Sequence, residues 1–242
     1  MKTYSNLHGY SMLLDTSETI QYLMSEQAYE PIETGWVSNF LNPGMNFVDI
    51  GANFGWYTTL ALQKVGKAGK VFGYEPGIQA FNSISLNLSK VDNLVLKNVA
   101  VGKTNGEISL YIPTTGDLYS PSSFYQFGNF EKVMVPMIKL DDDADLNQCD
   151  YIDFVKMDIE GSEPDALVGM ENLIKNNKVG RVLCEFNEFW LLQNGYNFEK
   201  LLLDFINYGF SIEAASDLAI IDTNEGGKSK LQNILFVHSS VR

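Results

Sequence analysis

The chain has 242 residues, of which 45% are hydrophobic and 19% are charged, so it can bury a substantial core. Acidic residues outnumber basic ones 30 to 17, and the resulting net charge of −13 argues against nucleic acid or anionic lipid as a partner. No apolar stretch approaches the about 18 residues of a membrane span, and the first residues contain no apolar run of signal-peptide length, so we expect no membrane span.

The two cysteines, Cys149 and Cys184, are too few for a disulfide framework or a four-cysteine zinc site. Cys184 lies in an apolar run and is expected to be a small buried residue. A reducing compartment is therefore the expected one, which makes the predicted location cytoplasmic.

The predicted elements begin with residues 1–44, a mixed segment that we expect to form an N-terminal extension or cap. Within it, residues 32–41 look helical and end at Asn42-Pro43-Gly44, a strong stop signal. From residue 45 onward, short β-type runs alternate with helix-type segments. Up to residue 101 this alternation predicts strands at 45–52, 70–75 and 94–101 and helices at 55–65 and 78–89.

The alternation is interrupted between residues 103 and 140, where the runs 107–112 and 132–140 predict an inserted β-hairpin. The loop between them, 114–130, is rich in aromatic residues that suit stacking on a sugar ring or an apolar acceptor, or packing against a second subunit of a homo-oligomer. These aromatic residues are Tyr119, Phe124, Tyr125 and Phe127. The acidic run that follows, Asp141 to Asp145, is predicted to be a solvated turn because its carboxylates are adjacent and not arranged around a point.

Alternation then resumes, with strands predicted at 154–159, 181–186, 211–215 and 234–238 and helices at 165–176 and 198–208. This pattern predicts an α/β fold over residues 45–242, a Rossmann-like, doubly wound, mainly parallel seven-stranded sheet with helices on both faces. Ligands of such sheets bind at the carboxyl ends of the strands.

The sharpest motif is Val48-Asp49-Ile50-Gly51-Ala52-Asn53-Phe54-Gly55, where a buried strand ends in a turn of small residues and a helix follows. Gly51 and Gly55 permit a tight turn and the close approach of a ligand. The start of the helix carries unpaired N–H groups and about half a positive charge, which suit a ligand carboxylate.

Glu75 ends the next predicted strand, 26 positions after Asp49, where a carboxylate can accept hydrogen bonds from both hydroxyls of a ribose. A dinucleotide site would need G-x-G-x-x-G, and Asp49 would face the phosphates unfavourably. An acidic start suits a ligand with an ammonium group and no phosphate. S-adenosylmethionine fits, with its carboxylate at the helix start, its ammonium near Asp49 and its ribose on Glu75, although another nucleoside ligand stays open.

A second acidic motif, Lys156-Met157-Asp158-Ile159-Glu160-Gly161-Ser162-Glu163, lies where the 154–159 strand ends. A hydroxyl acceptor of a methyl group needs a base for its proton, and the chain has only 2 histidines. We therefore expect a carboxylate base, Asp158 first and then Glu160 or Glu185, while Lys156 could stabilise a developing alkoxide. Converging carboxylates could also bind a divalent cation such as Mg²⁺, with Asp158 and Glu185 as its expected ligands.

The chain resembles the FkbM-type methyltransferases over residues 29–238, on motifs in the order and spacing of that family: VDIGANFGWYT, FGYEP, NVAVG, IKLDD and FVKMDIEGSEPDALVGM. These are class I, S-adenosylmethionine-dependent enzymes, commonly O-methyltransferases of sugar or polyketide hydroxyls. The run Tyr29-Glu30-Pro31, followed by Glu33 and Thr34, resembles the lead-in of the family and is expected to reach the cofactor. Together the motifs and the resemblance imply these cofactor-binding residues: Glu33, Thr34, Asp49, Gly51, Ala52, Asn53, Gly55, Tyr57, Thr58, Glu75, Pro76, Asn98, Val99, Ala100 and Asp158.

The expected function is therefore S-adenosylmethionine-dependent O-methylation of a hydroxyl on a sugar, a glycan or a polyketide-like small molecule. Two alternatives stay open: an N-methyltransferase or a protein or RNA methyltransferase, and a non-catalytic module that keeps the cofactor pocket. The acidity of the chain argues against RNA. The absence of an Asn/Asp-Pro-Pro-Tyr tetrapeptide after the fourth strand argues against the common amino-methylating pattern.

Overall fold

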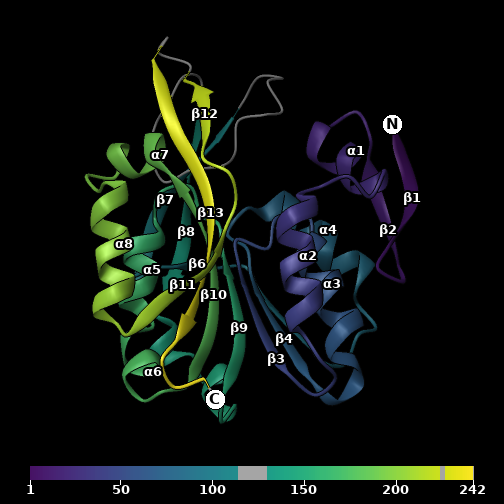
Figure 1. The fold of residues 1–242 in the computed structure, drawn as a ribbon. Helices are drawn as coiled ribbons and strands as arrows, with labels where there is room; N and C mark the ends of the chain where they lie inside the picture. The colour runs from purple at the N-terminus through teal and green to yellow at the C-terminus, as the bar shows by residue number, and fades with distance from the viewer. Residues whose placement is uncertain (114–129, 224–226, 242) are drawn as a thin grey trace.

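The computed structural model describes residues 1–113, 130–223 and 227–241. Its centre is an eight-stranded sheet, drawn in Figure 1, in which seven strands follow one path and β12 (Ala219–Asp222) joins β13 beside it. The path runs in the order β11 (Phe210–Ala215), β13 (Lys228–His238), β10 (Val179–Asn187), β9 (Ile152–Met157), β3 (Asn46–Ile50), β4 (Lys70–Tyr74) and β5 (Leu94–Lys97). The strands from β10 to β5 are parallel and β13 is antiparallel to its neighbours, so the predicted mainly parallel α/β sheet is confirmed.

Helices cover both faces of this sheet (Figure 1). One face carries α2 (Pro31–Phe40), α3 (Trp56–Val65) and α4 (Ile78–Asn87), and the other carries α5 (Glu163–Gly169), α6 (Glu171–Lys175) and α8 (Phe198–Asn207). Successive strand residues point to opposite faces, and both faces are covered by helices, so the strands bury side chains on both sides. Phe47 packs in the core under α3, for example, while Val48 packs in the core under α5.

The N-terminal segment contains more structure than its sequence pattern predicts. Before the predicted helix, which is α2, lie a β-hairpin of β1 (Lys2–Leu7) and β2 (Tyr10–Asp15) and a short helix, α1 (Thr19–Ser25). Leu7, Met12 and Leu14 are buried in the same core as α3, so packing and not local alternation holds the hairpin. None of the helices in the described ranges is long and apolar enough to cross a membrane.

Two predicted elements are each divided in the structure. The strand predicted at 94–101 is β5 followed by β6 (Ala100–Val101), which belongs to a separate sheet with β7 (Gly106–Pro113) and β8 (Phe130–Ile138) in the order β6-β8-β7. The helix predicted at 165–176 is α5 and α6, which meet at Met170. A Cβ at Gly169 would lie 2.2 Å from the Gly102 carbonyl oxygen, so the end of α5 packs directly on the chain after β6. A further short helix, α7 (Glu188–Gln193), was not predicted.

Candidate active site

The turn between β3 and α3 holds three residues in the left-handed backbone region, Gly51 at φ 82°, Asn53 at φ 49° and Gly55 at φ 88°. A Cβ at Gly51 would lie 2.1 Å from the carbonyl oxygen of Asp158, so no larger residue fits there. The N–H of Gly51 donates to the carbonyl of Tyr74 at 2.9 Å, which ties the turn to β4. The structure thereby brings the two motifs of the sequence, the glycine turn and the chain after β9, into direct contact.

Glu75 follows β4, and its carboxylate lies against the glycine turn. Oε2 accepts a hydrogen bond from the N–H of Asn53 at 2.8 Å, and Oε1 accepts one from the N–H of Gly77 at 2.7 Å. The residue is only 8% exposed, and this burial raises the pKa of its carboxyl to about 7 although both amide bonds act to lower it. Each oxygen keeps a further lone pair, so the side chain can still accept from ligand hydroxyls.

The residues after β5 differ in how close they come to Glu75. Nδ2 of Asn98 donates to the carbonyl oxygens of Glu75 at 2.8 Å and of Pro76 at 3.0 Å. Val99 is half-buried and packs against the apolar core, and Ala100 is buried in β6. Of these predicted cofactor residues, Asn98 and Pro76 lie beside Glu75, whereas Ala100 belongs to the added sheet.

Asp49 is enclosed inside the protein. Its Oδ2 accepts a hydrogen bond from the hydroxyl of Thr58 at 2.6 Å, and the residue is 1% exposed. Burial raises the pKa of Asp49 to about 6, while the bond from Thr58 and the charge of Lys156 act to lower it. The carboxylate therefore fastens β3 to α3, and the neighbouring turn residue Ala52 is buried as well.

Two predicted cofactor residues of α2 make contacts within the fold. Oε1 of Glu33 accepts from Nδ2 of Asn233 on β13 at 3.0 Å. Oγ1 of Thr34 accepts from Nε1 of Trp56 on α3 at 2.8 Å. These bonds fix α2 against the sheet and against α3.

The lead-in segment reaches the site through Glu30, which the sequence analysis placed only in the lead-in and not among the cofactor-binding residues. The hydroxyl of Tyr57 donates to Oε2 of Glu30 at 2.6 Å, and Glu30 itself lies just before α2 at φ 42°. The ring centroid of Tyr57 lies 5.3 Å from Nζ of Lys156. The only signal for Glu30 in the sequence was its position just before Pro31, which starts a helix. The orientation of α2 that turns Glu30 toward the site depends on contacts such as that of Glu33 with Asn233 on β13, which the sequence does not reveal.

Three carboxylates meet at the carboxyl ends of β9 and β10, and we call Asp158, Glu160 and Glu185 the carboxylate cluster. One oxygen from each lies within 4.8 Å of those of the other two. Glu160 adopts φ 55°, and its Oε2 is buried without a hydrogen-bond partner. The convergence that the sequence analysis raised for Asp158 and Glu185 thus includes a third carboxylate.

Lys156 is the cation beside this cluster. Its Nζ lies 3.2 Å from Oδ2 of Asp158, and the residue is 1% exposed. Burial raises the pKa values of Glu160 and Glu185 well above their usual range, and the charge of Asp158 raises them further. Burial alone would lower the pKa of Lys156, but the surrounding carboxylates raise it above its ordinary value. The ammonium group is therefore held in its charged form.

The two histidines make their hydrogen bonds away from the carboxylate cluster. His238 lies near the end of β13, where Nε2 is 3.1 Å from the carbonyl oxygen of Tyr208 and Nδ1 is 2.7 Å from Oγ of Ser240. Nδ1 of His8 is 3.1 Å from Oγ1 of Thr59. Both imidazoles therefore have their partners elsewhere in the fold.

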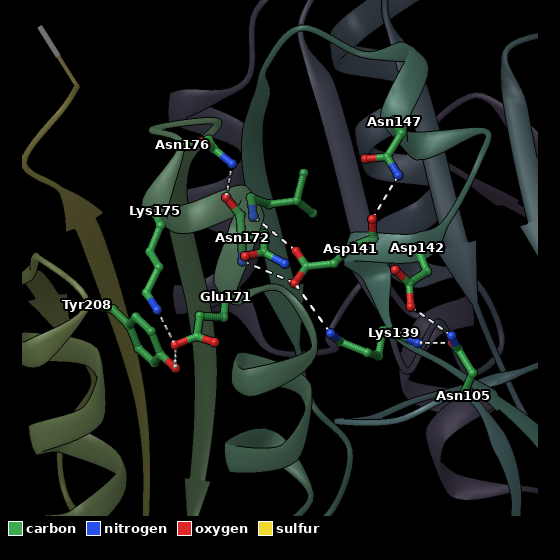
Figure 2. A network of polar contacts seen from close by, with 11 residues as sticks. Asn105, Lys139, Asp141, Asp142, Asn147, Glu171, Asn172, Lys175, Asn176 and Tyr208 are labelled. Carbon is green, nitrogen blue, oxygen red and sulfur yellow. Dashed lines mark hydrogen bonds and ion pairs between the residues drawn. The ribbon is translucent and has the colours of Figure 1, made fainter.

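The prediction that the acidic run is a solvated turn is wrong for Asp141 and Asp143, whose side chains are buried, while Asp142 and Asp145 are exposed. Figure 2 shows the Asp141 side chain against the start of α6, where its oxygens accept from the N–H groups of Asn172 and Leu173, each at 3.0 Å. Asp143 is 4% exposed and accepts from the hydroxyl of Tyr74 at 3.0 Å. The sequence of the acidic run does not reveal these partners, because the start of α6 and Tyr74 come from distant parts of the chain. The predicted acceptor-covering aromatics Tyr119, Phe124, Tyr125 and Phe127 lie outside the described residues.

The family model described as the methyltransferase FkbM domain matches residues 49–212. A curated relative, the 2-O-methyltransferase NoeI of Sinorhizobium fredii (strain NBRC 101917 / NGR234), is 30% identical over 148 residues. That alignment covers 55% of this chain and 60% of the relative, so the chain spans less than two thirds of the protein that it matches.

Two solved structures are among those that are similar to this chain. The precorrin-6y C5,15-methyltransferase of Geobacter metallireducens has a TM-score of 0.50 and 13% identity, over 93% of this chain and 94% of that one. The FkbM methyltransferase of Methylobacillus flagellatus has a TM-score of 0.47 and 15% identity, over 89% and 52% of the two chains. The first of these agrees with the predicted class I methyltransferase fold.

Proposed function

The chain belongs to the FkbM family of class I methyltransferases, and on that basis we propose that it uses S-adenosylmethionine to methylate a hydroxyl oxygen. The proposed acceptor is a sugar or glycan hydroxyl or a polyketide-like small molecule. The observation that carries the proposal is the carboxylate cluster beside Lys156, because it offers bases next to the glycine turn. The relative that is named a 2-O-methyltransferase supports oxygen as the acceptor atom.

The residues in and around the glycine turn fit the proposed cofactor. Glu75 has lone pairs for two ribose hydroxyls, and the start of α3 after Gly55 offers N–H groups to a carboxylate. When bound, the cofactor supplies a methyl group on a positively charged sulfur. The nearby carboxylates favour such a cation.

In the proposed reaction Asp158 accepts the proton of the acceptor hydroxyl while the oxygen attacks the methyl carbon. When bound, the cofactor would supply the methyl group of the new O–C bond, and its sulfur would keep the electron pair of the C–S bond that is lost. Lys156 orients Asp158 across the 3.2 Å contact and can stabilise negative charge on the acceptor oxygen. Alignment of the reactants could contribute about 7–11 kcal/mol, and a general base about 10²–10⁴-fold in rate.

We also propose that the carboxylate cluster holds a divalent cation, with Mg²⁺ as the first candidate. Three carboxylates whose oxygens lie within 4.8 Å of one another match the oxygen ligands of a hard cation. The buried Oε2 of Glu160, which lacks a hydrogen-bond partner, fits the same role. When bound, such an ion would lower the pKa of an acceptor hydroxyl. Calorimetric titration of Mg²⁺ into protein freed of metal by a chelator should give a saturable binding curve, whatever the sign of the heat, in wild type and not in Glu160→Gln. Full turnover in excess chelator would contradict the proposal.

Replacement of Asp158 by Asn tests the catalytic assignment, because it removes the charge and keeps the shape of the side chain. With glycosides and other hydroxylated compounds as acceptors, we expect the rate of S-adenosylhomocysteine formation to fall by about 10²–10⁴-fold. The affinity for S-adenosylhomocysteine, measured by calorimetry, should stay close to that of wild type. Asp150→Asn, at an exposed aspartate two residues before β9, is the control and should retain the full rate.

Full activity of the Asp158→Asn variant would refute the base assignment without touching the cofactor site. A wild-type protein that binds S-adenosylhomocysteine but methylates none of the acceptors would favour the non-catalytic binding module. Turnover with amines, proteins or RNA in place of hydroxyls would favour the other enzyme class.

We further propose that residues 1–44 act as a cap on the methyltransferase domain of residues 45–242. The contacts of α2 with β13 and α3, and of Glu30 with Tyr57, support this division. We also propose a reducing, cytoplasmic location, which the two free buried cysteines, Cys149 and Cys184, support.

A further inference from the structure

Four half-buried carboxylates surround one ammonium group at the carboxyl edge of the sheet. They are the three of the carboxylate cluster and Glu30, and the ammonium group is that of Lys156. With all of them ionised, four negative charges face one positive charge. Charges removed from water are costly unless they are paired, so this arrangement favours a cationic ligand.

Glu30 lies at the part of this edge where the amino-acid end of the cofactor is proposed to bind. Its partner Tyr57 is the second residue of α3, the helix that begins after the glycine turn. Oε2 of Glu30 accepts the Tyr57 hydroxyl, and a carboxylate retains lone pairs for further donors. Burial raises the pKa of Glu30, whereas the positive charge of Lys156 lowers it, so a cationic ligand here would stabilise its ionised form.

The other acidic side chains near the start of α3 are engaged within the fold. Asp49 accepts the hydroxyl of Thr58 and is 1% exposed, so it is enclosed between β3 and α3. Glu33 is bonded to Asn233 and faces β13. Glu75 and Asp158 also lie at the glycine turn, but they are proposed to receive the ribose hydroxyls and the acceptor proton, so Glu30 is the carboxylate left for a donor at the methionine end.

We propose that Glu30 binds the α-ammonium group of the cofactor, in place of Asp49. The inference rests on the proposed use of S-adenosylmethionine, whose methionine end carries this ammonium group. A charge-assisted hydrogen bond of this kind would make the protein select for ligands that carry the amino group. Glu30 would then be a binding residue, contributed by the segment before the methyltransferase domain.

The test compares two ligands that differ only in the amino group, S-adenosylhomocysteine and its des-amino analogue. Calorimetric titrations use the full chain as wild type, Glu30→Gln and the control Glu26→Gln, an exposed glutamate at the end of α1. Wild type and control should bind S-adenosylhomocysteine about 10- to 100-fold more tightly than the analogue. Glu30→Gln should lose this preference while binding the analogue as wild type does.

Equal weakening of both ligands in Glu30→Gln would mean that Glu30 only holds Tyr57, and unchanged affinities would remove any role in binding; either result overturns the inference. Glu30→Asp keeps the charge on a shorter side chain and should show an intermediate preference, so it provides the test should Glu30→Gln fail to fold. A wild-type chain that does not bind S-adenosylhomocysteine would instead refute the proposed function, and with it this inference.

Discussion

Gly51 is the residue at which the glycine turn and the chain after β9 meet. Its φ of 82° costs any other residue about 1–2 kcal/mol, and a Cβ would in addition lie 2.1 Å from the Asp158 carbonyl oxygen. The contact is with backbone, which cannot rotate away. Substitution at Gly51 should therefore displace Asp158 as well as the turn.

We expect Gly51→Ala to lower the free energy of unfolding, measured in urea, by more than about 2 kcal/mol and to weaken S-adenosylhomocysteine binding. Gly44→Ala is the matched control, because Gly44 has φ 90° but nothing within 4 Å of its Cβ position. The control should lose only about 1–2 kcal/mol and keep its affinity. Equal losses in the two variants would show that the contact with Asp158 adds nothing.

The proximity of Asp158 and Glu185 was predictable from the sequence, because both lie near the carboxyl ends of strands that were expected to be parallel. Sequence reasoning does not determine which residues of α2 turn inward. Glu33 accepts from Asn233, 200 positions later, and this bond, together with that of Thr34 to Trp56, orients the helix so that Glu30 faces the site. A helix of 10 residues with apolar positions on several sides carries no such information in its own sequence.

At the scale of elements, α6 depends on a cap that comes from another segment. Its own N-cap residue, Met170, has no side chain that can accept a hydrogen bond from the first turn. Asp141 supplies this acceptor to the N–H groups of Asn172 and Leu173 (Figure 2). A carboxylate is also favoured there by the partial positive charge of a helix start.

We expect Asp141→Ala to lower the free energy of unfolding by about 0.5–2 kcal/mol, because two N–H groups lose their acceptor. Asp142→Ala is the control, since Asp142 bonds to the exposed side chain of Asn105 and should have the smaller effect. Urea unfolding monitored by circular dichroism gives both values. A loss for Asp142→Ala that equals or exceeds that for Asp141→Ala would contradict the capping role.

Elements with strong local signals were predicted nearly to their ends, as for β3, α3, β4 and α4. Errors arise where a long-range contact divides a segment that looks continuous. The run 94–101 is apolar on both sides of Lys97 and Asn98 and therefore looks continuous, yet Asn98 leaves the strand to bond the carbonyl of Glu75. The hairpin β1–β2 escaped prediction because packing on the α3 side, and not its own alternation, provides its stability.

Glu163 should make the protein less stable at neutral pH than at moderately acidic pH. Its Oε1 accepts from the N–H of Ile159 at 2.9 Å, but its Oε2 is buried without a partner. Burial raises the pKa of Glu163 from 4.5 to about 7. The folded state therefore keeps the Glu163 proton to a higher pH than the unfolded state does. The stability that this proton contributes is complete below pH 4.5 and is lost as the pH rises through 7.

Between pH 4.5 and 7 the free energy of unfolding should fall less in Glu163→Gln than in wild type. Above pH 7 the two total decreases in this free energy should differ by about 1–3 kcal/mol. Glu107→Gln, at an exposed glutamate of β7, should follow the wild-type curve. Urea unfolding at a series of pH values measures the effect. Parallel curves for Glu163→Gln and wild type would rule out Glu163 as the source.

The overall architecture follows from the alternation of strand and helix patterns, since parallel strands need crossover helices and these cover both faces. The place of β13 does not follow from this rule. It is the last strand along the described chain, but it lies between β10 and β11 and supplies the only sheet partner of β11. The position of β13 between β10 and β11 depends on how its buried side chains pack in the sheet, and not on its place in the sequence.

This position of β13 has a consequence for biosynthesis. Strands β10 and β11 leave the ribosome before β13, so one edge of the nascent sheet stays open until residues 228–238 emerge. Asn233, which anchors α2 through Glu33, arrives at the same moment. A growing polypeptide therefore cannot fasten α2 to the sheet before residue 233 emerges, and chaperones that shield open sheet edges would be needed most during this interval.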